Sequence, residues 1–336
     1  MTYFRPIAMT DVARPTGALV LAAGWCWFDR VEILERGTPP RLGGLSDLTQ
    51  AQRDAFSRPR ADISGLVMDR PRIMGILNVT PDSFSDGGQF QDQTAAVAQA
   101  RAMAGAADIL DIGGESTRPG ATNVDVDEEI ARTAPVISAV RTAAMTNRIS
   151  IDTRKARVAA AALAAGADII NDVAAMAYDP QMAGLIVKSG VPVVLMHAKG
   201  TPADMQADPR YDDVVLDVYD FMKEKVTQAK AAGIADTQIV LDPGIGFGKS
   251  VAHNLALIRG LTLFHGLGCP ILLGASRKRF IGSISGTDDA AARMPGSLAV
   301  ALAGLAQGVQ ISRVHDVIET RQAFALWRAV NLGDAA

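Results

Sequence analysis

The chain has 336 residues, of which 49% are hydrophobic, and its formal net charge is −3. This length holds a barrel of about 250 residues plus an appendage. The charge balance provides no basic surface for nucleic acid, and no run reaches the roughly 18–20 apolar residues that span a bilayer, so neither a nucleic acid nor a membrane is an expected partner. Cys26 and Cys269 lie far apart without metal-ligand spacing, which favours buried, reduced thiols in a cytoplasmic protein.

Residues 1–62 share no pattern with the rest of the chain and predict an amino-terminal extension of unknown role, most simply a packing or solubility element. The apolar stretch 17–27 runs directly into Asp29 and Arg30 without a small-residue cleavage pattern, so we expect a β-strand there rather than a signal peptide. A polar helix is expected around 47–56. Residues 67–71 are expected to lead into the next domain as a hairpin over the amino-terminal end of a barrel.

From residue 73 to 315, one phrase recurs eight times: a short apolar run stops on a polar or charged residue and is followed by a segment with helical periodicity. The expected strands are 73–78, 107–111, 149–152, 168–171, 191–197, 239–242, 271–276 and 309–313. The expected helices are 94–106, 126–142, 155–165, 180–189, 212–232, 250–260, 290–308 and 317–330. Glycines stand just past four of these helices, where they are preferred as caps: Gly166, Gly190, Gly233 and Gly308.

Continuous apolar runs suit strands that are buried on both faces, and their alternation with helices makes the sheet parallel. The eight units therefore predict an α/β fold, a (β/α)8 TIM barrel over residues 63–336. The carboxyl ends of all strands meet at one face of such a barrel, where its enzymes keep their active sites. Asp, Asn and Ser at strand ends could simply cap the following helices. Lys278, Arg313 and His315 are poor caps, so a functional site is the better explanation of the set.

The loops that follow the first two strands, 78–88 and 111–120, are richer than a connector requires. Both combine glycines with hydroxyls and acids, and they contain Phe84 and Arg118. Loops of this kind at a barrel mouth can close over a substrate and exclude water.

Seven motifs follow one another in a fixed order: Asn78-Val-Thr-Pro-Asp-Ser-Phe-Ser-Asp-Gly-Gly, Asp111-Ile-Gly-Gly-Glu-Ser-Thr-Arg-Pro-Gly, Ile151-Asp-Thr, Ile170-Asn-Asp, Leu241-Asp-Pro-Gly-Ile-Gly-Phe-Gly-Lys, Ser276-Arg-Lys and Arg313-Val-His-Asp. Together they closely resemble the dihydropteroate synthase family over residues 64–330. The resemblance implies a transferase of folate biosynthesis that condenses 6-hydroxymethyl-7,8-dihydropterin pyrophosphate with p-aminobenzoate, giving 7,8-dihydropteroate and pyrophosphate. It also implies a target of sulfonamides. The extension is a departure, because many members begin shortly before the first strand.

The residue types suit that chemistry. A pterin presents a planar edge of adjacent donors and acceptors, which carboxylates and a carboxamide can bind by paired hydrogen bonds. The residues expected to bind the pterin are Asp152, Asn171, Met196, Asp242, Phe247 and Lys278. Arginine engages phosphate in a bidentate fork, and an asparagine oxygen suits Mg²⁺, the expected cofactor. The expected pyrophosphate ligands are Asn78, Thr117, Arg118, Arg313 and His315, with Asn78 as the metal ligand.

The resemblance further places p-aminobenzoate between the two long loops and the segment 276–279, at the amino terminus of a helix. The expected residues are Phe84, Pro119, Phe247, Lys278 and Arg279. The groups expected to act in catalysis are Asp86, Thr117, Arg118, Lys278, Arg313 and His315, with Asp86 holding the closed loops or the metal. The family is usually a homodimer, which apolar residues in 298–305 and 324–330 permit.

Two other functions stay open at this point. One is a related barrel that passes the methyl group of a reduced folate to a corrinoid protein, although the loop motifs and the Arg313/His315 pair favour a reaction that releases pyrophosphate. The other is a non-catalytic pterin-binding homologue. The segment 244–248 resembles a dinucleotide glycine loop but is expected to be a tight turn, since Pro243 precedes it. His197, His253 and His265 are not expected to act directly.

Overall fold

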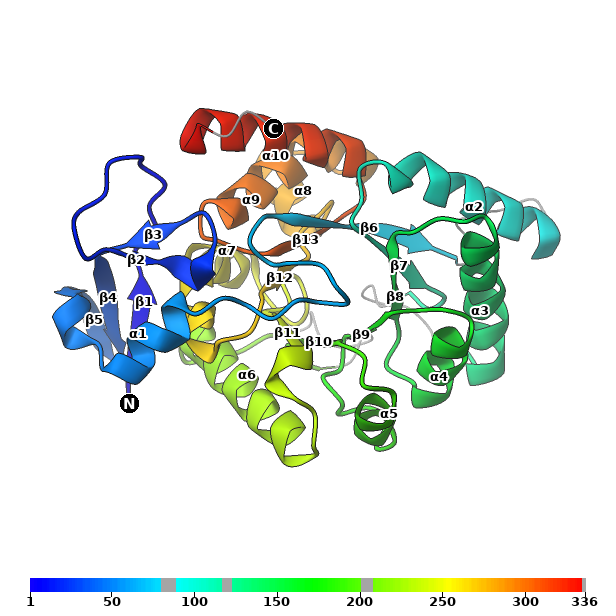
Figure 1. The fold of residues 1–336 in the computed structure, drawn as a ribbon, viewed down its shortest axis with the longest axis horizontal. Helices are drawn as coiled ribbons and strands as arrows, with labels where there is room; N and C mark the ends of the chain where they lie inside the picture. Colours follow the sequence, from blue (N-terminus) through cyan, green and yellow to red (C-terminus); the bar gives the residue numbers. More distant parts are fainter. Residues whose placement is uncertain (80–88, 117–122, 201–207, 334–336) are drawn as a thin grey trace.

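The computed structural model describes residues 1–79, 89–116, 123–200 and 208–333. Its centre is a parallel sheet whose strands come in the order β11-β10-β9-β8-β7-β6-β13-β12 (Figure 1). The strands are β6 (Arg72–Asn78), β7 (Ile109–Gly113), β8 (Arg148–Asp152), β9 (Ile169–Asp172), β10 (Val193–Met196), β11 (Ile239–Asp242), β12 (Leu272–Leu273) and β13 (Ile311–Val314). A parallel bridge between Leu241 and Ile271 joins the two edges. The predicted (β/α)8 barrel is confirmed.

Helices alternate with the strands and cover the outer face of the barrel (Figure 1). They are α2 (Gln89–Ala104), α3 (Val126–Thr142), α4 (Ala156–Ala164), α5 (Met182–Ser189), α6 (Val214–Ala231), α7 (Val251–Arg259), α8 (Arg279–Ser285), α9 (Met294–Leu305) and α10 (Val317–Leu332). Side-chain caps begin several of them: Asp125 accepts from Asp127 N, and Asp213 from Val215 N. Within the described ranges, no helix combines the length and the apolar character that crossing a bilayer requires.

Strand boundaries differ from the predicted ones at several places, and three of these differences concern residues of the barrel mouth. β7 continues to Gly113, so Asp111 lies inside the strand and not at its end. β12 has only two residues, because the chain turns after Leu273 and Ser276 belongs to the following segment. The expected strand 309–313 is shifted to Ile311–Val314. In each case the apolar run alone was a poor guide, since pairing with the neighbouring strands sets where a strand ends.

A hairpin closes the amino-terminal end of the barrel. Ile63 and Leu66 pair as an antiparallel bridge, directly before residues 67–71, where the hairpin was expected. Ile63 and Met68 are buried among side chains from the first halves of the strands. This apolar layer also contains Met74, Ile109, Ile169, Val194, Val240, Leu272 and Ile311.

The first residues form a small sheet of their own. β1 (Thr2–Pro6), β4 (Arg30–Glu35) and β5 (Thr38–Gly44) pair in an antiparallel manner, and α1 (Gln50–Ser57) follows, as the polar stretch predicted. The expectation of a single strand over 17–27 is wrong. The stretch is divided into β2 (Leu19–Val20), a 3-10 turn and β3 (Trp27–Phe28), because Ala22 and Ala23 adopt positive φ and reverse the chain.

This small sheet lies beside α6 and the end of α7, and the turn between β2 and β3 lies beside α9 (Figure 1). Trp25 Nε1 donates to Leu305 O at the end of α9 at 2.7 Å, and Thr262 Oγ1 donates to Pro6 O at 2.7 Å. Tyr3 and Tyr219 meet edge to face with ring centroids 5.6 Å apart. The extension is therefore packed on the barrel through both polar and apolar contacts.

Candidate active site

The polar residues expected at the strand ends converge on the carboxyl-terminal face of the barrel. Parallel register sets them in one layer, since Asp152 pairs with Gly113 on one side and with Asn171 on the other. Met196 likewise pairs with Asp242 across β10 and β11. Asp152, Asn171, Met196 and Asp242 are buried, so this layer lies within the barrel mouth and not on its rim.

Arg313 of β13 joins three strands across this layer. Its Nε donates to Asp111 Oδ2 at 2.6 Å, and its Nη2 donates to Asp152 Oδ2 at 2.7 Å. Asn171 Nδ2 also donates to Asp111 Oδ2, at 3.2 Å. Asp111 had no predicted role. An acidic residue inside an otherwise apolar strand was the signal that could have identified it, because an isolated buried charge is too costly to go unpaired.

Two carboxylate oxygens in this group, Asp111 Oδ1 and Asp152 Oδ1, are buried and have no hydrogen-bond partner. Burial raises the pKa of Asp152 to about 7, while the nearby Arg313 guanidinium lowers it and the Asp111 carboxylate raises it further. Burial lowers the pKa of Arg313, but Asp111 and Asp152 outweigh it and hold that pKa above its ordinary value. The site thus presents two buried carboxylate oxygens that a ligand with N–H donors could satisfy.

Asp242 ends β11 and is also buried. Its Oδ1 accepts from Gly244 N at 2.7 Å, which fixes the orientation of the carboxylate. Burial raises the pKa of Asp242, and the positive charge of Lys278 is the largest effect in the opposite direction.

Lys278 stands directly before α8 and donates from Nζ to Ile245 O. The same Nζ lies 4.4 Å from the centroid of the Phe247 ring, a cation–π contact. Burial lowers the pKa of Lys278 to about 8, against the opposing charge of Asp242. Arg279, the first residue of α8, is exposed. The expected grouping of Asp242, Phe247 and Lys278 is therefore present.

His315 and Asn78 complete the described part of the mouth. His315 Nδ1 lies 3.0 Å from Ser276 Oγ, and its backbone N donates to the same oxygen at 3.2 Å. Asn78 is the half-buried last residue of β6, beside Gly113 of β7. Five expected residues fall outside the described residues, and the structure places none of them: Phe84, Asp86, Thr117, Arg118 and Pro119. Among the described ranges, no group of three His, Cys, Asp or Glu side chains could hold a metal ion.

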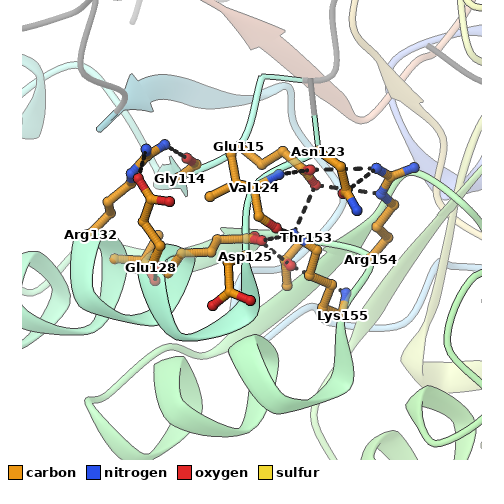
Figure 2. A network of polar contacts seen from close by, with 12 residues as sticks. Gly114, Glu115, Asn123, Val124, Asp125, Glu128, Arg132, Thr153, Arg154 and Lys155 are labelled. Carbon is orange, nitrogen blue, oxygen red and sulfur yellow. Dashed lines mark hydrogen bonds and ion pairs between the residues drawn. The ribbon is translucent and has the colours of Figure 1, made fainter. Parts of the chain in front are cut away.

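A buried charged network lies beside the mouth, after β7 and β8 (Figure 2). Lys155 Nζ is 2.6 Å from Glu129 Oε2 and 3.4 Å from Glu115 Oε2. Glu115 Oε1 accepts from Val124 N at 3.0 Å, and Arg154 Nε lies 3.4 Å from Glu115 Oε2. These contacts tie residue 115 to residue 124. The sequence pattern predicts Lys155 only as the start of a helix. Its contacts with two glutamates from other segments of the chain are not visible in the neighbouring sequence.

Residues 244–248 form a turn after β11, as expected, and no doubly wound sheet surrounds them. The histidines expected to be inactive differ in their surroundings. His265 is fully buried in a 3-10 segment, where its Nε2 lies 3.0 Å from Gln307 O. His253 lies on α7, with its ring 5.0 Å from that of Tyr211. His197 is buried at the end of β10, with its Nδ1 2.8 Å from Lys249 Nζ.

Comparison with known proteins agrees with this geometry. Residues 74–315 match the family model described as pterin binding enzyme. A dihydropteroate synthase of Neisseria meningitidis serogroup C is 47% identical over 269 residues, covering 79% of this chain and 94% of that protein. The dihydropteroate synthase of Escherichia coli K12 is 43% identical over 267 residues, with the same coverage of 79% and 94%.

Solved structures give the same result. Xanthomonas albilineans dihydropteroate synthase with 4-aminobenzoic acid superimposes with a TM-score of 0.76 and 48% identity, covering 81% of this chain and 98% of that one. A sulfonamide drug complex of the Yersinia pestis enzyme gives a TM-score of 0.74 and 43% identity, covering 78% and 95%. The chain therefore belongs to the dihydropteroate synthase family of pterin-binding enzymes.

Proposed function

We propose that this protein condenses 6-hydroxymethyl-7,8-dihydropterin pyrophosphate with p-aminobenzoate, giving 7,8-dihydropteroate and pyrophosphate. The observation that carries the proposal is the layer of paired charges in the barrel mouth, in which Asp111 Oδ1 and Asp152 Oδ1 are buried without partners. A pterin edge offers N–H donors that match such acceptors. Family membership supplies the reaction class.

The pterin would bind among Asp152, Asn171, Asp242 and Lys278, over the buried Met196 and beside the half-buried Phe247. Asp242 is suited to accept from the 2-amino side, because Gly244 N already holds its Oδ1 and leaves Oδ2 to face a ligand. Lys278 would donate toward the oxo group and N5. A buried charge-assisted hydrogen bond of this kind is worth roughly 1.5–3 kcal/mol.

Pyrophosphate would bind near Arg313 and His315. The Nε donor and one of the two Nη2 donors of Arg313 are taken by carboxylates, so the phosphate contact would fall to Nη1 and the second N–H of Nη2. Mg²⁺ would be held by Asn78, with water and phosphate oxygens as the other ligands. One amide ligand fits an ion that keeps several waters, and no described cluster of three acidic or histidine ligands competes for it. When bound, Mg²⁺ would stabilise the negative charge of the leaving pyrophosphate.

In the proposed mechanism, the carbon–oxygen bond to pyrophosphate breaks first and pyrophosphate leaves with the electron pair. The positive charge spreads over the dihydropterin ring, where Asp152 and Asp242 stabilise it. The amino nitrogen of p-aminobenzoate then forms the new carbon–nitrogen bond and releases its proton to solvent or to pyrophosphate. No covalent protein nucleophile takes part.

For p-aminobenzoate we propose a pocket made by Phe84, Pro119, Phe247, Lys278 and Arg279. Asp86, Thr117 and Arg118 would act from the two long loops, with Thr117 and Arg118 on the pyrophosphate. The aromatic face of Phe247, already covered by Lys278 on one side, supports this assignment. Arg118→Ala is expected to reduce turnover more than pterin affinity, and the reverse pattern would contradict the assignment of the loops.

The direct test is release of pyrophosphate from the pterin substrate by the purified full chain with Mg²⁺ and p-aminobenzoate. Formation of 7,8-dihydropteroate, its dependence on p-aminobenzoate and its inhibition by a sulfonamide would support the proposal. Pterin binding without product would instead indicate a non-catalytic homologue. Methyl transfer from methyltetrahydrofolate to a corrinoid acceptor would indicate the related methyltransferase barrel.

We also propose a cytoplasmic homodimer whose residues 1–62 serve as a packing extension and whose residues 63–336 form the catalytic barrel. Both cysteines are free and buried, in keeping with a reducing compartment. Ile318, Leu326 and Val330 of α10 are exposed apolar side chains that a second copy could cover. Light scattering of the wild type and of Leu326→Glu tests the dimer, which the glutamate should dissociate.

A further inference from the structure

A buried lysine outside the proposed substrate contacts underlies the pterin end of the site. Lys249 follows the glycine-rich turn 244–248 and is only 3% exposed. Its Nζ donates to Gly244 O at 2.8 Å and to Phe247 O at 3.0 Å. The third neighbour of Nζ is His197 Nδ1, at 2.8 Å.

These three contacts satisfy the lysine completely. An ammonium has three donors, so it donates to both carbonyls and to His197 Nδ1, which leaves the ring proton on Nε2. Burial lowers the pKa of Lys249 well below its ordinary range, with Asp242 opposing the shift. If the amine loses its proton, its lone pair accepts from His197 Nδ1–H instead. All three hydrogen bonds of Lys249 are therefore satisfied whether the amine is charged or neutral, and His197 supplies the third partner in both states.

The turn that Lys249 holds touches the site at three points. Gly244 N donates to Asp242 Oδ1 at 2.7 Å. Ile245 O accepts from Lys278 Nζ, and the ring of Phe247 lies under the same nitrogen. The orientations of the carboxylate, the ammonium and the aromatic ring therefore all depend on one short piece of backbone.

Close packing makes this turn and the end of β10 a single unit. A Cβ at Gly244 would lie 1.8 Å from His197 O, and one at Gly248 would lie 2.3 Å from Lys199 O. Both glycines adopt positive φ. No side chain fits between the two backbones. They are joined by the hydrogen bonds from His197 N to Asp242 O at 3.0 Å and from Tyr211 Oη to Gly248 O at 2.8 Å, and Lys249 and the His197 ring add the buried side-chain link. That ring is in turn fixed against Phe221, with centroids 4.7 Å apart.

We propose that Lys249 and His197 are positioning residues for the pterin subsite, holding the 244–247 turn so that Asp242, Lys278 and Phe247 keep the geometry that binds the ring. This inference rests on the proposed function, since it assumes that these three residues bind a pterin. It assigns no contact with substrate to Lys249. At the pyrophosphate end, Arg313 is held by Asp111 and Asp152 and His315 by Ser276, so both should keep their positions when the turn is loosened.

The experiment measures dissociation constants of the full-length protein for 6-hydroxymethyl-7,8-dihydropterin, with and without its pyrophosphate group. Lys249→Met keeps the length of the side chain and removes its polar contacts. It should weaken binding of both ligands by about 10–100-fold, as loss of an orienting group behind a ligand typically does. The ratio of the two constants, which isolates the pyrophosphate contribution, should stay within about 3-fold of wild type, whereas a general distortion of the mouth would change it.

Lys199→Met is the matched control, because the backbone of Lys199 also packs against the turn at Gly248, whereas its side chain donates to Arg210 O. It should bind both ligands as the wild type does. If Lys249→Met also binds like wild type, the inference is wrong. Wild-type protein that binds neither ligand would instead overturn the proposed function, so the two failures are distinguishable.

A second pair of variants decides the matter if Lys249→Met does not fold. The side-chain amide of His197→Asn can replace ring Nδ1 as partner of Lys249, whereas His197→Leu cannot. The asparagine variant should bind the pterin within about 3-fold of wild type, and the leucine variant about 10-fold more weakly. Equal affinities in the two variants would overturn the positioning role, because packing alone would then explain His197.

Discussion

The two ends of the barrel interior differ in kind, although the same strands build both. At the amino-terminal end the inward side chains form an apolar layer, which Ile63 and Met68 close. At the carboxyl-terminal end they are Asp111 and Asp152, held by arginine and asparagine, and Asp242, held by the backbone N of Gly244. The first layer contributes stability by burying hydrocarbon, whereas the second keeps carboxylates out of water with two oxygens unsatisfied.

The polar end therefore costs stability in the absence of ligand. The raised pKa of Asp152 reflects this loss of stability, because burial favours the protonated carboxyl over the carboxylate in the folded protein. Its contribution to stability is present below the ordinary pKa of an aspartate and is lost as the pH rises to about 7. Substitutions at the polar end should therefore change mainly ligand affinity, and substitutions at the apolar end should change mainly the free energy of unfolding.

The largest effect is expected from Asp242→Ala. It removes the buried acceptor for the pterin and should weaken pterin affinity by about 1,000-fold, or ~4 kcal/mol for two charge-assisted hydrogen bonds. Calorimetric titration measures the affinity, and circular dichroism checks that the fold is retained. Asp242→Asn serves as control, since its oxygen can still accept from Gly244 N. Unchanged pterin affinity in the alanine variant would refute the assignment.

At the opposite end, Met68→Ala should lower the free energy of unfolding by about 3 kcal/mol, because it leaves a cavity in the apolar layer. Pterin affinity should stay as in the wild type. Urea denaturation measures the first quantity and titration the second. The adjacent Val67→Ala, at a half-exposed position, should change stability by less than about 0.5 kcal/mol. A loss of pterin affinity in Met68→Ala would show that the two ends are coupled.

The pH dependence of pterin binding should report Asp152. Its carboxylate form, the better acceptor, appears as the pH rises through about 7, so affinity should increase up to that pH. Below it, affinity should fall by up to about tenfold per pH unit, since one proton competes with the ligand. Asp152→Asn should bind more weakly but lose this component of the slope. The same slope in wild type and variant would assign the titration to another group.

The smallest effect concerns the extension. Trp25→Phe removes the hydrogen bond from Nε1 to Leu305 O and should lower the free energy of unfolding by about 1 kcal/mol without changing turnover. Trp27→Phe loses a similar bond inside the extension, to Asp11 O, and is the control. One shared unfolding transition in both variants is expected from the packing of the extension on the barrel. A separate early transition for residues 1–62 would contradict it.

Periodicity was sufficient for much of the fold. Each strand and helix can be predicted from a pattern within about ten neighbouring residues, and eight strand–helix repeats together predict a closed barrel. Four strands end at the predicted residue or one residue later, and this places Asp152, Asn171, Asp242 and Arg313 at the same end of the barrel. The prediction of one strand over 17–27 failed because alanine gives no indication of the positive φ that Ala22 and Ala23 adopt.

The sequence by itself thus determined the barrel, the face that carries the site and the residue types available there, because these follow from local patterns and from the rule that parallel strands end together. Only the tertiary structure decided the pairings. Arg313 is hydrogen-bonded to Asp111 and Asp152, which lie 202 and 161 residues away in the sequence. Lys249 contacts His197 across a separation of 52 residues. Such contacts exist only once the barrel has closed, since closure excludes water and requires each buried charge to find a partner.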